Sequence, residues 1–419
     1  MGTRRAAMAG MIGNVLEWYD FAVYGFFAAT IGKHYFPSDD PTVSVVAAFG
    51  VFAIGFLARP IGAVILGHLG DLLGRRRVMM ISIMMMAVPT FLIGVMPTYD
   101  TLGVMAPVVL ILLRLMQGAS VGGELTSSVT FMIEEAAPGK GRTLAGSWSF
   151  SGAIGGVLLG SLVGTLITSL LTADQVDAWG WRLPFLAGLI IAVTGMVLRR
   201  DLNRAPGQEA EEKLHYAKGL GDLPLLRAIR EHRGDFLRAI GITAFDAAGF
   251  YILFVYITTY LSGVTGMPGS QAFEIDTVSM VVLVVLIPIS AWMGDRIGLQ
   301  RMCLASSGAG IVLTIPLFML MDHGDPGLSL IGELCFAVIL APFIAGFGTR
   351  MALLFPREIR MSAFSVSYNI GLAVFGGTAP MLASYLIERG AGNLSPAYLL
   401  TASAAISFLC LLSARRSPS

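Results

Sequence analysis

Long apolar runs separated by short polar connections dominate the pattern of residues along this chain. A helix needs about 20 residues to cross the hydrocarbon core of a bilayer, and runs of about that length recur from one end of the sequence to the other. They fall at residues 10–33, 42–68, 78–96, 103–134, 143–171, 183–199, 236–262, 274–293, 302–321, 329–354, 362–387 and 397–414. The pattern therefore predicts an all-α integral membrane protein with twelve transmembrane helices.

Composition agrees with this prediction and narrows the possible functions. Of the 419 residues, 55% are hydrophobic and only 13% are charged, about half of the ~25% that is usual for a soluble domain. The net charge of +1 gives no reason to expect a nucleic-acid partner. Cys303, Cys335 and Cys410 lack the paired spacing of a metal or redox site, so we expect no metal and no cofactor.

Basic residues in the connections predict how the chain is oriented. Twenty-one loop Lys and Arg residues fall on the side that holds both termini and the central polar stretch, whereas Lys33, Arg182 and Arg389 fall on the other side. Because basic loops stay on the cytoplasmic face, both termini are expected to be cytoplasmic. We expect a multi-pass protein of the plasma (inner) membrane.

A polar stretch at residues 200–235 separates six apolar runs from six. It predicts a cytoplasmic linker between an N-terminal bundle, residues 1–199, and a C-terminal bundle, residues 236–419. The two parts also resemble each other, because a Gly-Asp pair follows the second run at Gly70 and the eighth run at Gly294, 224 residues later. The same offset relates Glu134 to Glu358. Duplicated six-helix units are typical of transporters.

Six charged residues lie well inside the predicted runs, away from their ends: Glu17, Asp20, Arg59, Arg114, Glu124 and Asp246. Each would cost about 3 kcal/mol if it faced lipid, so these side chains must pair with one another or line a wet cavity. Charged groups at middle depth in both halves are typical of the substrate and coupling-ion sites of transporters. A purely structural role as ion pairs is the alternative.

The carboxylates are the candidates for proton coupling. Asp20, Glu124 and Asp246 come first and Glu17 follows, since a carboxyl group in a low-dielectric site can bind and release a proton near neutral pH. The substrate candidates begin with arginine, whose planar fork of donors matches a carboxylate: Arg114 first and Arg59 second. Further substrate candidates are Gln117 beside Arg114, Asn14 and Tyr24 on the polar stripe of the first run, and Tyr251, Tyr368 and Asn369.

The connection after the second run predicts a gating latch. Gly70 and Gly74 permit a tight turn, and Asp71 can accept hydrogen bonds from the amino end of a facing helix, where the helix dipole favours an anion. Asp71 can also pair with a basic residue such as Arg142. Arg75 completes the signature, and Asp295 is the counterpart of Asp71 in the second half.

Several of these segments also carry a family resemblance. Residues 67–77 resemble the cytoplasmic loop signature of the major facilitator superfamily. Residues 14–21, 114–124, 368–370 and 375–380 are similar to the metabolite:proton symporter family, whose members move proline and betaine, 2-oxoglutarate, citrate or shikimate. The resemblance implies the major facilitator fold, with two six-helix bundles, a central cavity and alternating access. It also implies that the latch holds the outward-facing state.

The expected function is secondary active transport, in which a small organic acid enters with protons. Arg114 and Arg59 favour an anionic substrate. The alternative is proton symport of a zwitterionic compatible solute such as proline or betaine, because Asp246 suits a cationic group. A drug or metabolite exporter and a non-transporting sensor are less favoured. The sequence has no HExxH motif and no protease-type aspartate pair, so we expect no enzymatic activity. We expect a functional monomer.

Overall fold

The computed structural model describes residues 14–15, 17–73, 75–122, 124–135, 141–188 and 224–414, and these residues contain helices and no strands. In the first half, residues 17–26 are helical. They are followed by α2 (Ala28–Tyr35), α3 (Pro41–Leu73), α4 (Arg75–Val95), α5 (Tyr99–Leu102), α6 (Met105–Ser120), α7 (Glu124–Glu135), α8 (Arg142–Leu170), α9 (Ala173–Ala178) and the short 3-10 helix η1 (Gly180–Arg182).

The second half is helical in the same way, with two single π-helical segments. Its elements are α12 (Pro224–Glu231), α13 (Arg233–Tyr251), the π segment η2 (Ile252–Tyr256), α14 (Ile257–Gly263), α15 (Gly269–Ile297), α16 (Leu299–Met321), α17 (Pro326–Ala352), α18 (Arg357–Gly371), the π segment η3 (Leu372–Gly377), α19 (Ala379–Glu388) and α20 (Ser395–Ser413).

The helices agree with the twelve apolar runs. Within the described residues, nine helices are long and apolar enough to cross a membrane. The other three predicted runs correspond to the helical residues 17–35, to α4 with its shorter apolar part Ile81–Val95, and to a helix that starts at residue 183. Residues 189–199 of this last run lie outside the described residues, as does most of the predicted linker.

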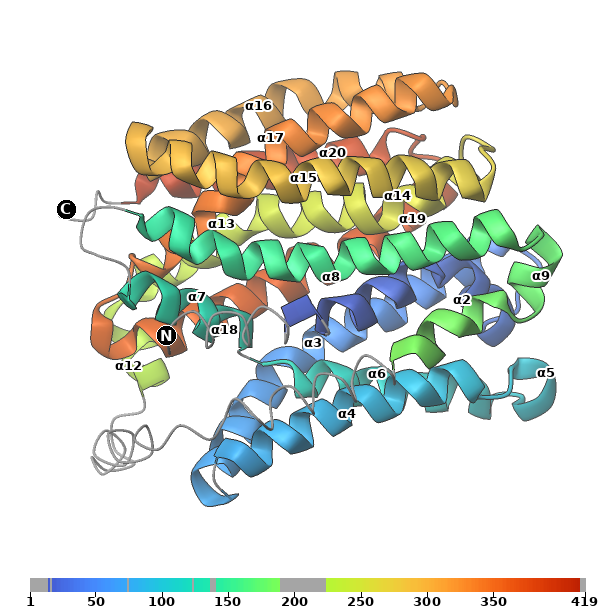
Figure 1. The fold of residues 1–419 in the computed structure, drawn as a ribbon, viewed down its shortest axis with the longest axis horizontal. Helices are drawn as coiled ribbons and strands as arrows, with labels where there is room; N and C mark the ends of the chain where they lie inside the picture. Colours follow the sequence, from blue (N-terminus) through green and yellow to red (C-terminus); the bar gives the residue numbers. More distant parts are fainter. Residues whose placement is uncertain are drawn as a thin grey trace.

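The long helices lie side by side along one axis (Figure 1). At one end of the bundle lie α12 and the start of α13, and at the opposite end lie α5 and α9. We call these the α12 end and the α9 end. Between the two halves runs a seam, where α8 packs against α15 and α17, while α3 packs against η3 and α19.

The fourth predicted run, residues 103–134, is interrupted and does not form one continuous helix. The chain leaves the helix after Ser120 and resumes it at Glu124. Gly122 explains part of this path: a Cβ atom there would lie 2.4 Å from the Cα of Ala63 on α3. The glycine therefore lets two backbones approach closely, a packing mode common between membrane helices.

Candidate functional site

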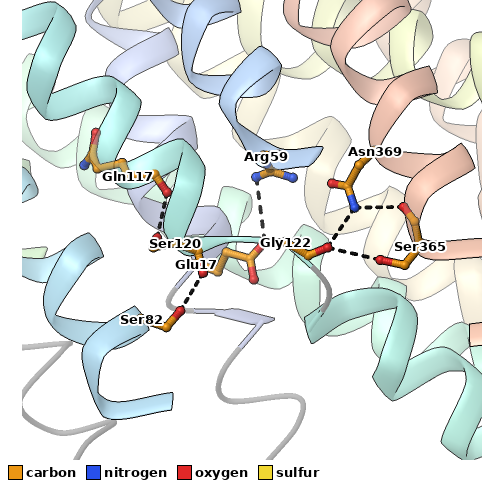
Figure 2. A network of polar contacts seen from close by, with 8 residues as sticks. All are labelled: Glu17, Arg59, Ser82, Gln117, Ser120, Gly122, Ser365 and Asn369. Carbon is orange, nitrogen blue, oxygen red and sulfur yellow. Dashed lines mark hydrogen bonds and ion pairs between the residues drawn. The ribbon is translucent and has the colours of Figure 1, made fainter. Parts of the chain in front are cut away.

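Arg59 lies at the centre of a buried cluster on the N-terminal side of the seam. Its side chain is 2% exposed, and its Nη2 lies 3.7 Å from Oε1 of Glu17 (Figure 2). The guanidinium also packs on the rings of Phe21 at 4.3 Å, Phe56 at 4.5 Å and Trp18 at 5.3 Å. The flat, weakly hydrated cation is suited to this aromatic environment.

Arg114 begins a chain of hydrogen bonds that ends at a carboxyl group. Its Nη1 donates to Oε1 of Gln117 at 3.0 Å, and Nε2 of Gln117 donates to Oγ1 of Thr90 at 2.7 Å. Thr90 Oγ1 in turn lies 2.9 Å from Oδ2 of Asp20 and 2.8 Å from the carbonyl oxygen of Met86. The sequence predicted Arg114, Gln117 and Asp20 but not Thr90, whose hydroxyl joins them.

The two arginines have donors left over. Within the described residues, Nε and Nη2 of Arg59 and Nε and Nη2 of Arg114 are buried and donate no hydrogen bond. A buried donor without a partner costs about 1–3 kcal/mol, and such groups in folded proteins call for an explanation. A carboxylate placed against either guanidinium would supply acceptors for the spare donors of that arginine.

A small cavity opens on the seam next to this cluster. It measures about 20 Å³, room for about one water molecule. Both halves contribute to its wall, which consists of Trp18, Phe150, Ala153, Ile154, Asp246, Ala247, Phe250, Tyr251, Ile344, Tyr368 and Leu372. Five of these eleven residues are aromatic, five are aliphatic and one is a carboxylate, and aromatic faces beside a carboxylate suit an organic cation. The cavity must widen before a larger solute enters.

The remaining predicted substrate residues divide into two groups. Tyr251 and Tyr368 line the cavity. Asn14, Tyr24 and Asn369 instead bind backbone carbonyls: those of Ser149 at 3.4 Å, Ala48 at 3.1 Å and Gly122 at 3.0 Å, respectively. In this state their polar groups hold helices together and do not point into the cavity.

Of the two Gly-Asp motifs that were predicted to act in gating, the one in the second half has described side-chain contacts. Asp295 Oδ1 accepts a hydrogen bond from the backbone N–H of Thr143 at 3.0 Å, and Oδ2 accepts one from Leu144 at 3.2 Å. These amides form the first turn of α8, which begins at Arg142 and belongs to the other half. Gly74 lies outside the described residues, as do the side chains of Asp71, Arg75 and Glu124; Gly70 belongs to the last turn of α3.

Two more contacts cross the seam at the α12 end. Arg360 Nη1 forms an ion pair with Oε1 of Glu134 at 2.9 Å. The carbonyl oxygen of Gly122, at the break between α6 and α7, accepts hydrogen bonds from Ser365 and Asn369 of α18 (Figure 2). The break in the fourth run therefore has a partner in the other half.

One pair of buried charged residues was not predicted from the sequence. Asp276 and Glu333 are fully buried in the second half. They fell close to the starts of the predicted runs 274–293 and 329–354, where an acidic residue normally reaches water. The helices begin earlier than predicted, at Gly269 and Pro326, so both carboxyl groups lie inside the bundle.

Comparisons with known proteins agree with this architecture. Residues 6–206 and 208–412 match the sugar (and other) transporter family. The chain is 36% identical over 413 residues to the proline/betaine transporter of Escherichia coli (strain K12), covering 97% of this chain and 82% of that protein. It is 36% identical over 412 residues to the glycine betaine/proline/ectoine/pipecolic acid transporter OusA of Dickeya dadantii (strain 3937), with the same coverage.

Solved structures show the same fold. The crystal structure of a D-xylose-proton symporter superposes with a TM-score of 0.75 and 17% sequence identity, covering 100% of this chain and 99% of that one. A major facilitator superfamily proton:xylose symporter bound to a bromodeoxyglucose superposes with a TM-score of 0.74. The twelve-helix fold predicted from the sequence is thereby confirmed. The chain belongs to the sugar (and other) transporter family and is a multi-pass membrane transporter with the major facilitator fold.

Proposed function

We propose that this protein imports a small zwitterionic solute, such as proline or betaine, together with protons. The relatives named above favour this solute class, which the sequence alone ranked second to an organic acid. The observation that carries the proposal is the cavity on the seam, with its five aromatic residues and single carboxylate. No step of the proposed cycle changes the solute chemically.

The two ends of a zwitterion would bind different parts of this site. The faces of Trp18, Phe250 and Tyr251 attract an ammonium group through their ring quadrupoles, and Asp246 adds a direct charge. The solute carboxylate would bind Arg59, whose guanidinium packs on Trp18 and has donors to spare. Arg114 packs instead on Tyr24 and other rings that do not line the cavity, so we assign it second place.

Proton coupling follows from competition for Arg59. Oε1 of Glu17 lies 3.7 Å from Nη2 of Arg59, and the cation favours the ionised carboxylate. A solute carboxylate competes for the same guanidinium, and the released Glu17 then binds a proton. Loading of solute and proton therefore favour each other, as linkage requires.

Asp20 supports a second proton position. When it is ionised, Thr90 can donate its hydroxyl hydrogen to Oδ2 of Asp20. When it is protonated, Asp20 donates to Thr90, which then donates to the carbonyl of Met86 and still accepts from Gln117. All groups in the chain keep partners in both states, so a proton can enter without leaving a buried donor unpaired.

Topology and assembly complete the proposal. The bias of basic residues supports a cytoplasmic α12 end, with both termini on that side of the plasma (inner) membrane and with residues 200–235 as the linker between the bundles. One chain supplies both walls of the cavity, which supports a functional monomer.

Cysteines introduced at Gly207 and at Pro326 should label from the cytoplasmic and external faces, respectively. External labelling at Gly207 would contradict this topology.

The solute is tested by thermal shift of the purified protein with betaine, proline, 2-oxoglutarate and shikimate. Only the zwitterions should raise the melting temperature, and Asp246→Asn and Trp18→Leu should weaken that response. Stabilisation by the dicarboxylate alone would favour the organic acid.

In proteoliposomes with an imposed pH gradient, Glu17→Gln should abolish concentrative uptake but keep counterflow of labelled solute. Uptake that follows sodium and ignores the proton gradient would refute proton coupling.

A further inference from the structure

Two buried carboxyl groups near the α9 end have no role in the transport site described above. Asp276 on α15 and Glu333 on α17 each lie seven residues inside their helices, a depth of about 10 Å at 1.5 Å per residue. Both are 0% exposed. Ser279 joins them, because its Oγ lies 2.9 Å from the carbonyl oxygen of Asp276 and 3.4 Å from Oε2 of Glu333.

No cation balances this pair in the described part of the chain. Neither carboxyl group forms an ion pair there, and the helices packed around them place their charged side chains elsewhere. Three arginines on the neighbouring helices lie at the opposite, α12 end: Arg142 in the first turn of α8, Arg301 in the first turn of α16 and Arg350 near the last turn of α17. On α15 itself, Asp295 and Arg296 also lie at the α12 end. Glu274 of α15 is exposed. The titratable Tyr260 of α14 is bonded to Asp322.

The hydrogen bonds of the pair are also incomplete. Asp276 Oδ2 accepts a hydrogen bond from Ser161 on α8, at 2.5 Å. Among the described residues, Asp276 Oδ1 and Glu333 Oε1 are buried without any partner. Removing a carboxylate from water costs several kcal/mol when no cation compensates it, so two negative charges cannot be held here in this closed state. A bound proton removes a charge and supplies the missing donor.

We propose that Asp276 and Glu333 form a proton-binding site, separate from Glu17, Asp20 and Asp246, and that a proton bound there holds the two halves together at the α9 end. Ser161 belongs to the first half and Asp276 to the second. Their contact is extended by Thr277, whose Oγ1 lies 2.7 Å from Ser161 Oγ and 2.8 Å from Thr165 Oγ1. Loss of the proton leaves a charge that needs water, and water reaches it when α8 and α15 separate.

The direction of the effect follows from these contacts. At high proton concentration the pair holds its proton and the α9 end stays closed. At low proton concentration the pair loses this proton, carries two negative charges, and the α9 end opens. If the α9 end is external, as proposed above, an inward proton gradient loads this site from outside and closes the entrance behind the solute. The inference rests on the proposed alternating access but not on the identity of the solute.

The test measures the distance between spin labels on cysteines at Asp174 and Ala391, one in each half and both exposed at the α9 end. The native cysteines are replaced by serine, and the protein is studied in nanodiscs without solute from pH 5 to pH 9. The wild type should change from a short to a long distance as the pH rises. Asp276→Asn, which mimics the neutral carboxyl group, should keep the short distance throughout.

Two further variants make the outcome decisive. Glu274→Gln removes an exposed acid two residues away and should leave the wild-type pH dependence unchanged. Glu333→Gln leaves one carboxyl group without a like charge beside it, so opening should begin at a lower pH. The proposal is overturned if the wild-type distance ignores pH, if both Asp276→Asn and Glu333→Gln behave as wild type, or if exchanging sodium for choline at constant pH produces the change. Because no solute is present, these outcomes leave the assignment of the solute untouched.

Discussion

The two ends of the seam are closed by different kinds of contact. At the α12 end the contacts are ionic or directed at backbone groups: Asp295 on the first turn of α8, Arg360 on Glu134, and Asn369 on the carbonyl of Gly122. At the α9 end they are aromatic or involve hydroxyl and carboxyl groups. Phe273 packs on Phe26 and Phe27, with ring centroids at 5.6 and 5.8 Å, and Ser161 bonds to Asp276.

This difference means that the two ends respond to different conditions. Ionic contacts near an aqueous surface weaken when salt screens them, whereas apolar packing is not weakened by charge screening. The α12 end should therefore loosen in high salt and the α9 end should not. Since each end has its own source of stability, a substitution can open one end while the other stays closed, as alternating access requires. The following variants test this separation.

The largest effect is expected from Phe273→Ala. The ring is 6% exposed and lies where a Cβ on Gly164 would be, at 2.4 Å from its Cε1. Truncating a well-packed phenylalanine costs about 3 kcal/mol or more, which shifts the equilibrium toward an open α9 end by roughly 100-fold. The distance between labels at Asp174 and Ala391 should lengthen, and equally so in high salt.

A matched truncation within one half provides the control for this variant. Phe318 is buried on α16 against Tyr260 and Phe336 and makes no ring contact across the seam. Phe318→Ala should lower the melting temperature and leave the label distance unchanged. An equal change of distance in both variants would show that Phe273 does not act through the seam.

The next effect is expected at the opposite end, from Asp295→Ala. Two backbone amides of α8 lose their acceptor, and a charge of this kind at a helix N-terminus is worth up to about 2 kcal/mol. The α12 end should open by about tenfold or more, seen as a longer distance between labels at Phe131 and Leu237. Asp295→Asn keeps one acceptor oxygen, so its label distance should lie between those of the wild type and Asp295→Ala. A longer distance at the α9 end would contradict the separation of the two ends.

A smaller effect is expected from Asn369→Leu. The amide is 4% exposed and donates to the carbonyl of Gly122 at 3.0 Å, but Ser365 donates to the same oxygen at 3.1 Å. The carbonyl keeps one partner, so the loss should be about 1 kcal/mol. Adding Ser365→Ala removes the second partner, and the double variant should open the α12 end by more than the sum of the single effects. Simple additivity would argue against a shared acceptor.

The smallest effect is expected from the ion pair of Glu134 and Arg360. The Glu134 side chain is 43% exposed, and pairs of this kind contribute about 0.2–1 kcal/mol. Glu134→Lys and Arg360→Glu should each loosen the α12 end slightly, and the double variant should restore it. In 1 M salt, where the screening length is about 3 Å, all four proteins should give the same label distance.

The sequence predicted the helices, and its repeated Gly-Asp motif marked a residue that caps a facing helix. Capping of a facing helix was expected of Asp71, and the structure describes it for Asp295, which occupies the corresponding place 224 residues later. The duplicated Gly-Asp motif marks both positions equally. The side chain of Asp71 lies outside the described residues, so its capping role stays a prediction.

The missed residues have physical causes as well. Asp276 and Glu333 were not predicted as buried because the start of an apolar run in the sequence does not show where the helix itself begins. Thr90 gave no signal at all, because a single hydroxyl in an apolar run usually bonds its own helix. The break in the fourth run did have a signal, the consecutive glycines at 122 and 123. Arg59 could be placed ahead of Arg114 as the candidate for binding the solute carboxylate only once the residues of the cavity wall were known.

The break at Gly122 has a consequence for how the chain is made. Its carbonyl is bound by Ser365 and Asn369, which follow it by 243 and 247 residues. At a synthesis rate of about 5–20 residues per second, the ribosome needs on the order of 10–50 s to reach them. During that interval the first six helices are already made, but the carbonyl oxygen of Gly122 lacks its two donors because Ser365 and Asn369 have not been synthesised. A nascent chain arrested before residue 365 should therefore be a better substrate for a membrane chaperone or protease than one released a few residues later.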